Sequence, residues 1–69
     1  MIADGYPETV VQTAAFVKRV RHTLTITQAE LARLCDVQVF TVCRWETATH
    51  RPHLKHWRRL HELDPYRTT

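Results

Sequence analysis

Basic side chains are concentrated in residues 44–59, and the chemistry they offer is the binding of a polyanion. One carboxylate, that of Glu46, stands there against a set of cationic and imidazole groups: Arg44, Arg51, Lys55, Arg58 and Arg59, with His50, His53 and His56 among them. In residues 1–36, by contrast, four basic and four acidic residues cancel. Such a run is either the solvated face of a helix or a contact with nucleic acid or an anionic membrane. Charge alone leaves these readings open.

The histidines also raise the question of a metal site. His53 and His56 are three residues apart, with His50 before them and His61 beyond. A zinc site needs four ligands in a closed tetrahedron, and no cysteine pair or HExxH pattern is nearby. The two cysteines, Cys35 and Cys43, are separated by seven residues, match no common metal or redox spacing, and are expected to be reduced thiols that are buried or half-buried. No metal or cofactor is expected.

An enzyme and a membrane protein are both disfavoured. The chain has no nucleophile–base pair, glycine-rich phosphate loop or paired carboxylates, and 69 residues leave little room for a sheltered cleft. No pocket for a small-molecule ligand is indicated. No apolar stretch approaches the roughly 20 residues of a membrane span, and no basic segment followed by an apolar one opens the chain. We expect a cytoplasmic protein.

The elements that must position these side chains are helices, because the chain has a single Gly, three Pro and no sustained alternation of β-branched residues. Apolar residues at helical spacing predict helices over 7–22, over a short segment between Thr27 and Asp36, over 38–46, and from Pro52 to the Asp64-Pro65 stop. The predicted organisation is an arm over 1–6, one all-α domain over 7–64 and a tail over 65–69.

The start of the second helix carries the strongest local signal. Thr27-Gln28-Ala29-Glu30 is a capping box, in which hydroxyl and carboxylate satisfy each other's backbone N–H groups. Asp36 stands where the chain must turn, and Val42 and Trp45 are expected to anchor the next helix to the core. Two short helices joined in this way can present the second helix to the major groove of DNA.

An ordered set of residues resembles the Cro/C1-type (XRE) helix-turn-helix family. It comprises Thr27-Gln28-Ala29-Glu30-Leu31-Ala32, Val37, Thr41-Val42-Cys43-Arg44-Trp45-Glu46 and Arg51-Pro52. With the first helix, the match covers about residues 16–60 without a gap. The resemblance implies a compact four- or five-helix DNA-binding domain of the kind found in phage, plasmid and bacterial repressors, with the helix-turn-helix at about 27–47. Small phage and anti-CRISPR-associated regulators are similar.

The third helix would then read bases through Gln38, Val39, Phe40 and Arg44. Glutamine can bond an adenine edge in two places and arginine a guanine edge, while Val39 and Phe40 can contact thymine methyl groups. Two alternatives stay open here. Phe40 could pack on the second helix or lie in a protein interface, and Arg44 could contact phosphate.

Other residues are expected to contact the DNA backbone. The resemblance implies this role for Gln28 and for the loop after the third helix, whose hydroxyl, imidazole and guanidinium groups suit phosphate. The full set is Gln28, Thr41, Thr47, Thr49, His50 and Arg51. The resemblance further implies a salt bridge between Arg21 and Glu46; the alternative is an Arg21 that contacts phosphate.

The chain departs from the family pattern at three turns. Asp36 and Ala48 occupy positions where the family usually has Gly, and Gln38 stands where Ser or Thr often caps the third helix. Asp tolerates the left-handed conformation better than most residues. The departures therefore put the loop at Ala48 and the start of the third helix in question.

The expected function is a dimeric repressor, acting on its own promoter, that binds an inverted-repeat operator in double-stranded DNA. The first choice of dimer surface is the apolar residues at the end of the chain, Trp57, Leu60, Leu63 and Tyr66, and the second choice is the first helix. The alternative is an antitoxin or adapter on the same fold whose main role is to bind a protein partner. Apolar surface left over from the core, at Trp57, Leu63 or Tyr66, would favour it.

Overall fold

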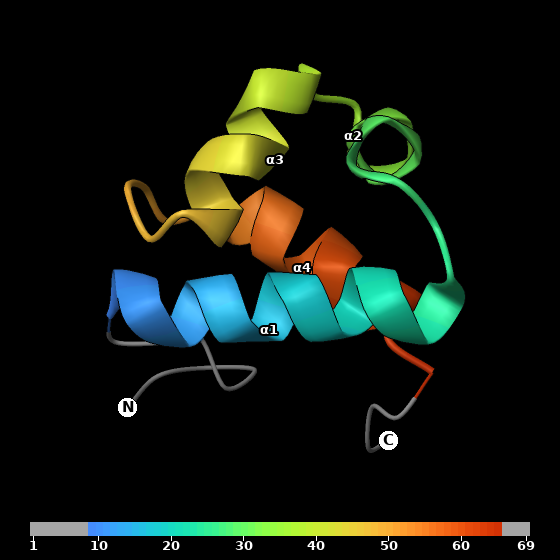
Figure 1. The fold of residues 1–69 in the computed structure, drawn as a ribbon, viewed down its shortest axis with the longest axis horizontal. Helices are drawn as coiled ribbons and strands as arrows, with labels where there is room; N and C mark the ends of the chain where they lie inside the picture. The colour runs from blue at the N-terminus through green and yellow to red at the C-terminus, as the bar shows by residue number, and fades with distance from the viewer. Residues whose placement is uncertain (1–8, 66–69) are drawn as a thin grey trace.

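The computed structural model describes residues 9–65, which form four helices joined by short turns (Figure 1). The helices are α1 (Val10–Leu24), α2 (Gln28–Cys35), α3 (Val39–Glu46) and α4 (Leu54–Leu63). Within residues 9–65 there is no strand, so the predicted all-helical class is confirmed for this part of the chain. α1 runs along one side of the molecule, and α2 and α3 lie together across from it. None of the four helices is long and apolar enough to cross a membrane.

α1 begins later than the position of Pro7 predicts. Its N-cap is Thr9, whose Oγ1 accepts a hydrogen bond from the backbone N–H of Gln12 at 3.1 Å. A capping hydroxyl satisfies one of the first backbone donors of a helix, which proline cannot do. Thr9-Val10-Val11-Gln12 follows the Thr-x-x-Gln pattern of a capping box, and this signal marks the true start.

A residue with left-handed backbone follows each of the first three helices: Thr25 (φ 58°) and Asp36 (φ 59°) directly after α1 and α2, and Ala48 (φ 62°) two residues after the end of α3. At each end the next two amides bond back to the last turn; after α2, Asp36 N–H donates to Arg33 O and Val37 N–H to Ala32 O. This is the Schellman arrangement, which usually takes glycine at the left-handed position. The turn at Asp36 thus forms without the family's glycine.

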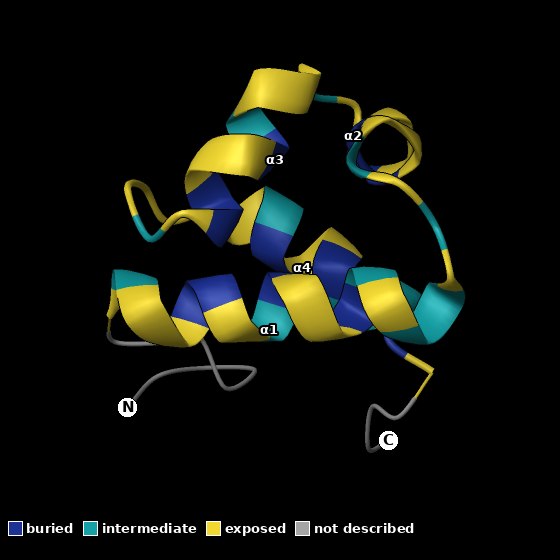
Figure 2. Ribbon diagram, viewed as in Figure 1, coloured by how far each residue is buried: buried dark blue, intermediate teal, exposed yellow. Residues whose placement is uncertain are grey.

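The core is built from one face of each helix (Figure 2). Its buried members come from all four helices: Val17, Leu31, Ala32, Cys35, Val42, Trp45, Trp57 and Leu60. Phe16, Ile26, Val37 and Leu63 pack against them from partly buried positions. Burial raises the pKa of the Cys35 thiol to about 11, so this sulfur stays protonated and is part of the packing.

α4 closes the core and is tied to α1 at its end. His53 is its N-cap and Pro52 is buried just before it. Asp64 ends the helix, and its nearly buried carboxylate accepts a 2.6 Å hydrogen bond from the guanidinium of Arg19. The ion pair fixes the last turn of α4 against α1.

The dimer surface expected at the end of the chain needs correction. Trp57 is 2% exposed and Leu60 is fully buried, because both fill the core of a single protomer. Leu63 is half-buried against the same core, and Tyr66 lies outside the described residues. Trp57 and Leu60 therefore cannot contact a partner, and of these four residues only the partly exposed Leu63 is described at a surface.

Candidate nucleic-acid interface

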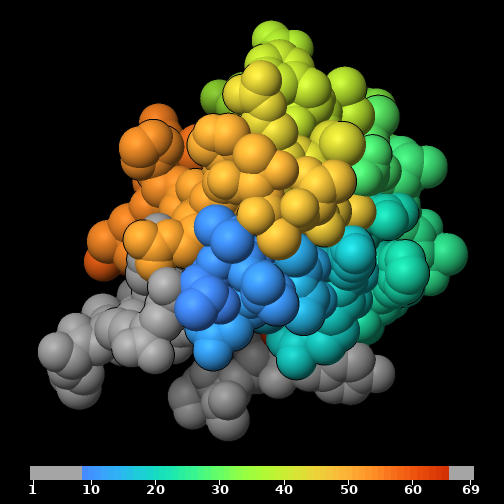
Figure 3. Space-filling view, turned by 60° about the vertical axis from the view of Figure 1, so that its left-hand side comes forward, coloured from blue at the N-terminus to red at the C-terminus, as the bar shows by residue number. Residues whose placement is uncertain are grey.

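The exposed side of α3 carries the residues expected to read bases. Gln38, the N-cap, and Val39, Phe40 and Arg44 are all exposed. The opposite side of α3 contributes Val42 and Trp45 to the core. In the space-filling view α3 projects from the molecule, with the loop 47–53 below it beside the start of α1 (Figure 3).

Phe40 and Arg44 contact each other on this exposed side. The guanidinium carbon of Arg44 lies 4.9 Å from the centroid of the Phe40 ring, in a cation–π arrangement. Phe40 is 51% exposed. The ring is therefore not buried in the contact between α2 and α3.

Cys43 belongs to the same exposed face, contrary to the expectation that both cysteines are at least half-buried. It is a free, exposed thiol, whereas Cys35 is buried. At helical spacing residue 43 lies one turn after 39 and beside 40, on the side away from Val42 and Trp45. That spacing, applied to the predicted third helix, is the signal that would have placed it.

Arg21, Gln28 and Glu46 come together although they lie in three different helices. Arg21 Nε donates to Glu46 Oε2 at 2.8 Å, and Arg21 Nη2 donates to Oε1 at 3.2 Å. Gln28 Nε2 donates to the same Oε1 at 3.0 Å. The expected pair of Arg21 and Glu46 is thus present, and Gln28, expected to contact only phosphate, joins it as a third member.

The ionisation of this cluster is set by its hydrogen bonds. Burial alone would raise the pKa of the Glu46 carboxyl, but the hydrogen bonds from Arg21 and Gln28 and the nearby charges of Arg21 and Lys18 lower it more, so the pKa lies below its usual value. The hydrogen bond to Glu46 likewise raises the pKa of Arg21. The pair is charged at neutral pH and joins the end of α3 to α1 and α2.

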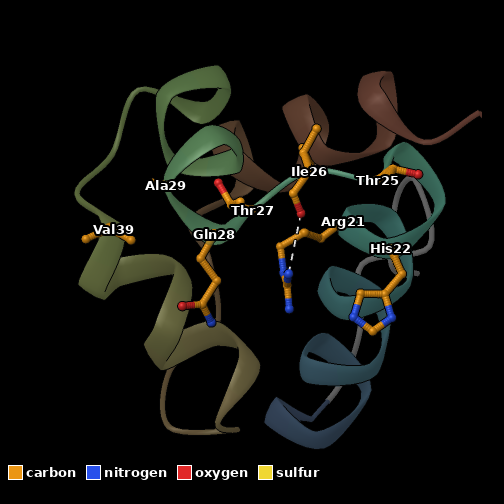
Figure 4. Close-up of a pocket in the computed structure, with 8 residues that line it drawn as sticks. All are labelled: Arg21, His22, Thr25, Ile26, Thr27, Gln28, Ala29 and Val39. Carbon is orange, nitrogen blue, oxygen red and sulfur yellow. Dashed lines mark hydrogen bonds between the residues drawn. The ribbon is translucent and has the colours of Figure 1, made fainter.

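A broad, shallow groove of about 760 Å³ lies beside this cluster, at the start of α2 (Figure 4). It is lined by Arg21, His22, Thr25, Ile26, Thr27, Gln28, Ala29 and Val39. Thr27 accepts hydrogen bonds from the amides of Glu30 and Leu31, through its hydroxyl and its carbonyl. The amides of Gln28 and Ala29 have no acceptor within residues 9–65, so they are the donors available to an anion.

A second groove, of about 350 Å³, is lined by the length of α3 from Gln38 to Trp45 and by the segment that leads into α4. Two arginines and three histidines are among the residues that line it. The full lining is Val37, Gln38, Thr41, Arg44, Trp45, His50, Arg51, Pro52, His53 and His56. Of the expected backbone-contacting residues, Thr41, His50 and Arg51 therefore share one concave surface with Arg44. This surface is suited to a phosphate.

His56 is the most enclosed of the three histidines in this groove. Its ring lies 5.9 Å from that of Trp45 and 6.4 Å from that of His53. Burial lowers the pKa of His56, and the charges of Lys55 and His53 lower it further, against a smaller opposite effect of Asp36. In the described part of the chain no three His, Cys, Asp or Glu side chains converge as metal ligands.

Thr47 and Thr49 are exposed but take part in the structure of the loop. The Thr47 hydroxyl donates to Cys43 O at 2.9 Å and lies 3.0 Å from the Thr49 hydroxyl. Thr49 N–H donates to Arg44 O at 3.0 Å. Both side chains therefore support the end of α3, and a contact with phosphate would require a hydroxyl to turn its O–H from its partner in the protein to a phosphate oxygen.

Comparisons with protein-family models, curated proteins and solved structures found no match for this chain. What the protein does must follow from its residues and their geometry.

Proposed function

We propose that this protein binds double-stranded DNA by placing α3 in the major groove, as a regulator of the Cro/C1 helix-turn-helix type. The observation that carries the proposal is an exposed helix face that bears hydrogen-bonding and apolar groups suited to base edges and is flanked by two grooves lined with polar and basic groups. A helix anchored by Val42 and Trp45, and tied to α1 and α2 through Glu46, holds that face at one angle.

The two grooves supply the phosphate contacts of this proposal. In the groove at the start of α2, the amides of Gln28 and Ala29 meet a phosphate together with the positive end of the α2 dipole. In the second groove, His50 and Arg51 meet another phosphate. Contacts of this kind position the protein and give salt-sensitive affinity, and the bases contacted by α3 give specificity.

The protein acts as a homodimer on an inverted repeat in this proposal, and it represses by occluding a promoter. One protomer presents one α3, which covers a few base pairs; two copies about 34 Å apart along the duplex read enough sequence to find one site. No chemical step is needed. Of the apolar residues that would favour the rival role, an antitoxin or adapter, Trp57 is buried in the core, whereas Val11, Leu34 and Leu54 are exposed elsewhere.

Selection of bound sites from random duplexes tests the proposal. We expect enrichment of an inverted repeat whose half-sites are about 10 base pairs apart, centre to centre. Recovery of no enriched sequence, under low-salt conditions in which weak binding is retained, would contradict it. The matched control is Val42→Asp, which removes the core anchor of α3 and should abolish enrichment.

A further inference from the structure

We propose that Phe40 and Arg44 act as one reading unit that recognises a guanine next to a thymine, with Phe40 positioning the guanidinium of Arg44. The inference rests on the proposed function and deepens it. It assigns to two residues that contact each other on the exposed side of α3 a joint preference for two neighbouring bases, which neither residue would have alone.

The contact leaves the useful edge of Arg44 free. The N–H groups of a guanidinium lie in its plane, so a ring stacked on one face does not consume them. Within residues 9–65 the Arg44 guanidinium donates no hydrogen bond to a carboxylate or carbonyl, and the side chain is exposed. The fork can therefore meet guanine O6 and N7 while it stays on the ring.

The distance between the two groups suits adjacent base pairs. The guanidinium carbon is 4.9 Å from the ring centroid, and successive bases are about 3.4 Å apart along a strand. When Arg44 bonds a guanine, the exposed edge of Phe40 is therefore placed over the neighbouring base pair. The group that an aromatic ring can contact there is the thymine C5 methyl.

Preorganisation gives the unit its advantage. A free arginine must be ordered on binding, and each ordered long side chain reduces affinity. The Phe40 ring restricts Arg44 before DNA arrives, through an attraction that is modest in water and stronger when the groove is desolvated. Phe40 thus affects discrimination at a base pair that it does not itself touch.

The test compares three single variants, and the double variant that combines Phe40→Ala with Arg44→Ala, on duplexes derived from the selected site. Phe40→Tyr keeps an aromatic face, Phe40→Ala removes it, and Arg44→Ala removes the guanidinium. On one duplex the guanine contacted by Arg44 is replaced by adenine, and on another the neighbouring thymine is replaced by uracil, which removes only the methyl. Circular dichroism verifies that each variant is folded; all three changes are at exposed positions.

The expected result is coupling between the two positions. Phe40→Ala should reduce the discrimination of guanine over adenine about two- to fivefold, whereas Phe40→Tyr should discriminate as well as the wild type. The change from thymine to uracil should weaken binding by the wild type about fourfold and binding by Phe40→Ala hardly at all. In Arg44→Ala, further removal of Phe40 should leave the guanine preference unchanged.

Two results would overturn the inference, and they are distinguishable. If Phe40→Ala alters only the response to uracil and leaves guanine discrimination intact, the protein reads DNA but the two residues act separately. If selection recovers no duplex at all, the proposed function fails and the reading unit with it. In the free protein, the ring of Phe40 should shift the Arg44 side-chain proton resonances upfield, and unchanged shifts in Phe40→Ala would contradict the contact itself.

Discussion

At the scale of single residues, the candidate interface contains two kinds of polar group. The guanidinium of Arg44 has its hydrogen-bonding edge free, whereas the amide of Gln28 and the hydroxyl of Thr47 are already bonded within the protein. A group with free donors can gain new bonds on binding, while a bonded group must exchange one partner for another. Arg44 is therefore expected to contribute more to specificity than Gln28 or Thr47.

Replacement of Arg44 by Ala tests this directly. The variant should lose about 1–3 kcal/mol of discrimination at one base pair, because a bidentate contact with guanine is removed while the phosphate contacts remain. Affinities for the selected site and for all its single-base variants, measured by fluorescence anisotropy, give the readout.

Arg51→Ala is the matched control, since it also removes one exposed guanidinium near the same groove. It should weaken all duplexes by a similar factor and reduce the salt dependence by about one phosphate contact. If instead Arg44→Ala left the ranking of site variants unchanged, its role as a base reader would be wrong.

A pH dependence is expected at His56. Its pKa is lowered in the free protein, mainly by burial, so the ring is neutral at pH 7. A phosphate in the groove favours the charged ring and raises this pKa, so binding takes up a proton. Affinity should be highest below the free-protein pKa and should fall as the pH rises through the pKa of the complex.

His56→Gln checks this effect. The variant should have a flatter affinity profile across the range in which the imidazole titrates, and isothermal calorimetry in buffers of different ionisation enthalpy should register a smaller proton uptake. Equal proton uptake by the wild type and the variant would show that the linked group is not His56.

At the scale of elements, the orientation of α3 depends on charged groups from its neighbours. Glu46 ends α3 and accepts hydrogen bonds from α1 and α2. Buried pairs of this type contribute less to net stability than to geometry, but the loss of one partner is costly because the other is left unpaired. The reading angle of α3 should therefore respond to changes at Glu46.

Glu46→Gln should lower the free energy of unfolding at neutral pH by about 1–3 kcal/mol. The folded-state pKa of Glu46 is lowered, so its contribution is fully present above the unfolded value of 4.5 and is lost as the pH falls through the folded value. Urea unfolding from neutral to acid pH should thus give a smaller acid-induced loss in the variant than in the wild type.

Glu62→Gln is the control, because Glu62 also faces an arginine but is 64% exposed. Exposed pairs contribute little, so this variant should be close to the wild type. A pH profile of Glu46→Gln that followed the wild-type profile through the acid limb would contradict the ionised, hydrogen-bonded state of Glu46.

The helix ends offer a gain in stability. Ala48 has φ 62°, a conformation that glycine adopts without the steric cost of a Cβ. Ala48→Gly should therefore stabilise the fold by about 0.5–1 kcal/mol. Ala15→Gly, at an exposed position inside α1, should destabilise the fold by a similar amount. Thermal unfolding of the two variants shows whether an Ala-to-Gly change stabilises the protein at a positive φ and destabilises it inside a helix.

Local signals in the sequence account for much of this arrangement. The capping box at Thr27, the stop at Asp64-Pro65 and the inward pair of Val42 and Trp45 all depend on short-range spacing, which is visible in a sequence. The start of α1 differs from the predicted one because the hydroxyl of Thr9, not Pro7, caps the helix. The Thr-x-x-Gln spacing that marks this cap is also visible in the sequence.

Other features depend on how distant helices pack, and spacing could not supply them. The engagement of Gln28 by Glu46, the ion pair of Arg19 with Asp64 and the stacking of Arg44 on Phe40 require the relative rotation of neighbouring helices. Likewise, an apolar stripe on α4 does not reveal whether it faces the core or a partner. In this small chain Trp57 and Leu60 are buried in the core, because few other large side chains are available to fill it.

At the scale of the whole molecule, the candidate interface is made by three neighbouring segments of the chain. The start of α2, the exposed face of α3 and the loop leading to α4 supply, in turn, free amides, base-reading side chains and cationic groups. The contact of the proposed dimer would have to use surface outside the α4 core residues, and exposed apolar groups remain at Val11, Leu34 and Leu54.

The most direct test of the central claim is a titration of ¹⁵N-labelled protein with the selected duplex, followed by NMR. The account predicts that the largest amide shifts fall on the exposed face of α3, on Gln28 and Ala29, and on the loop from Thr47 to His53. The exposed middle of α1, away from the two grooves, should be unaffected. Shifts confined to other surfaces, or no shifts at concentrations at which the duplex was selected, would contradict the account.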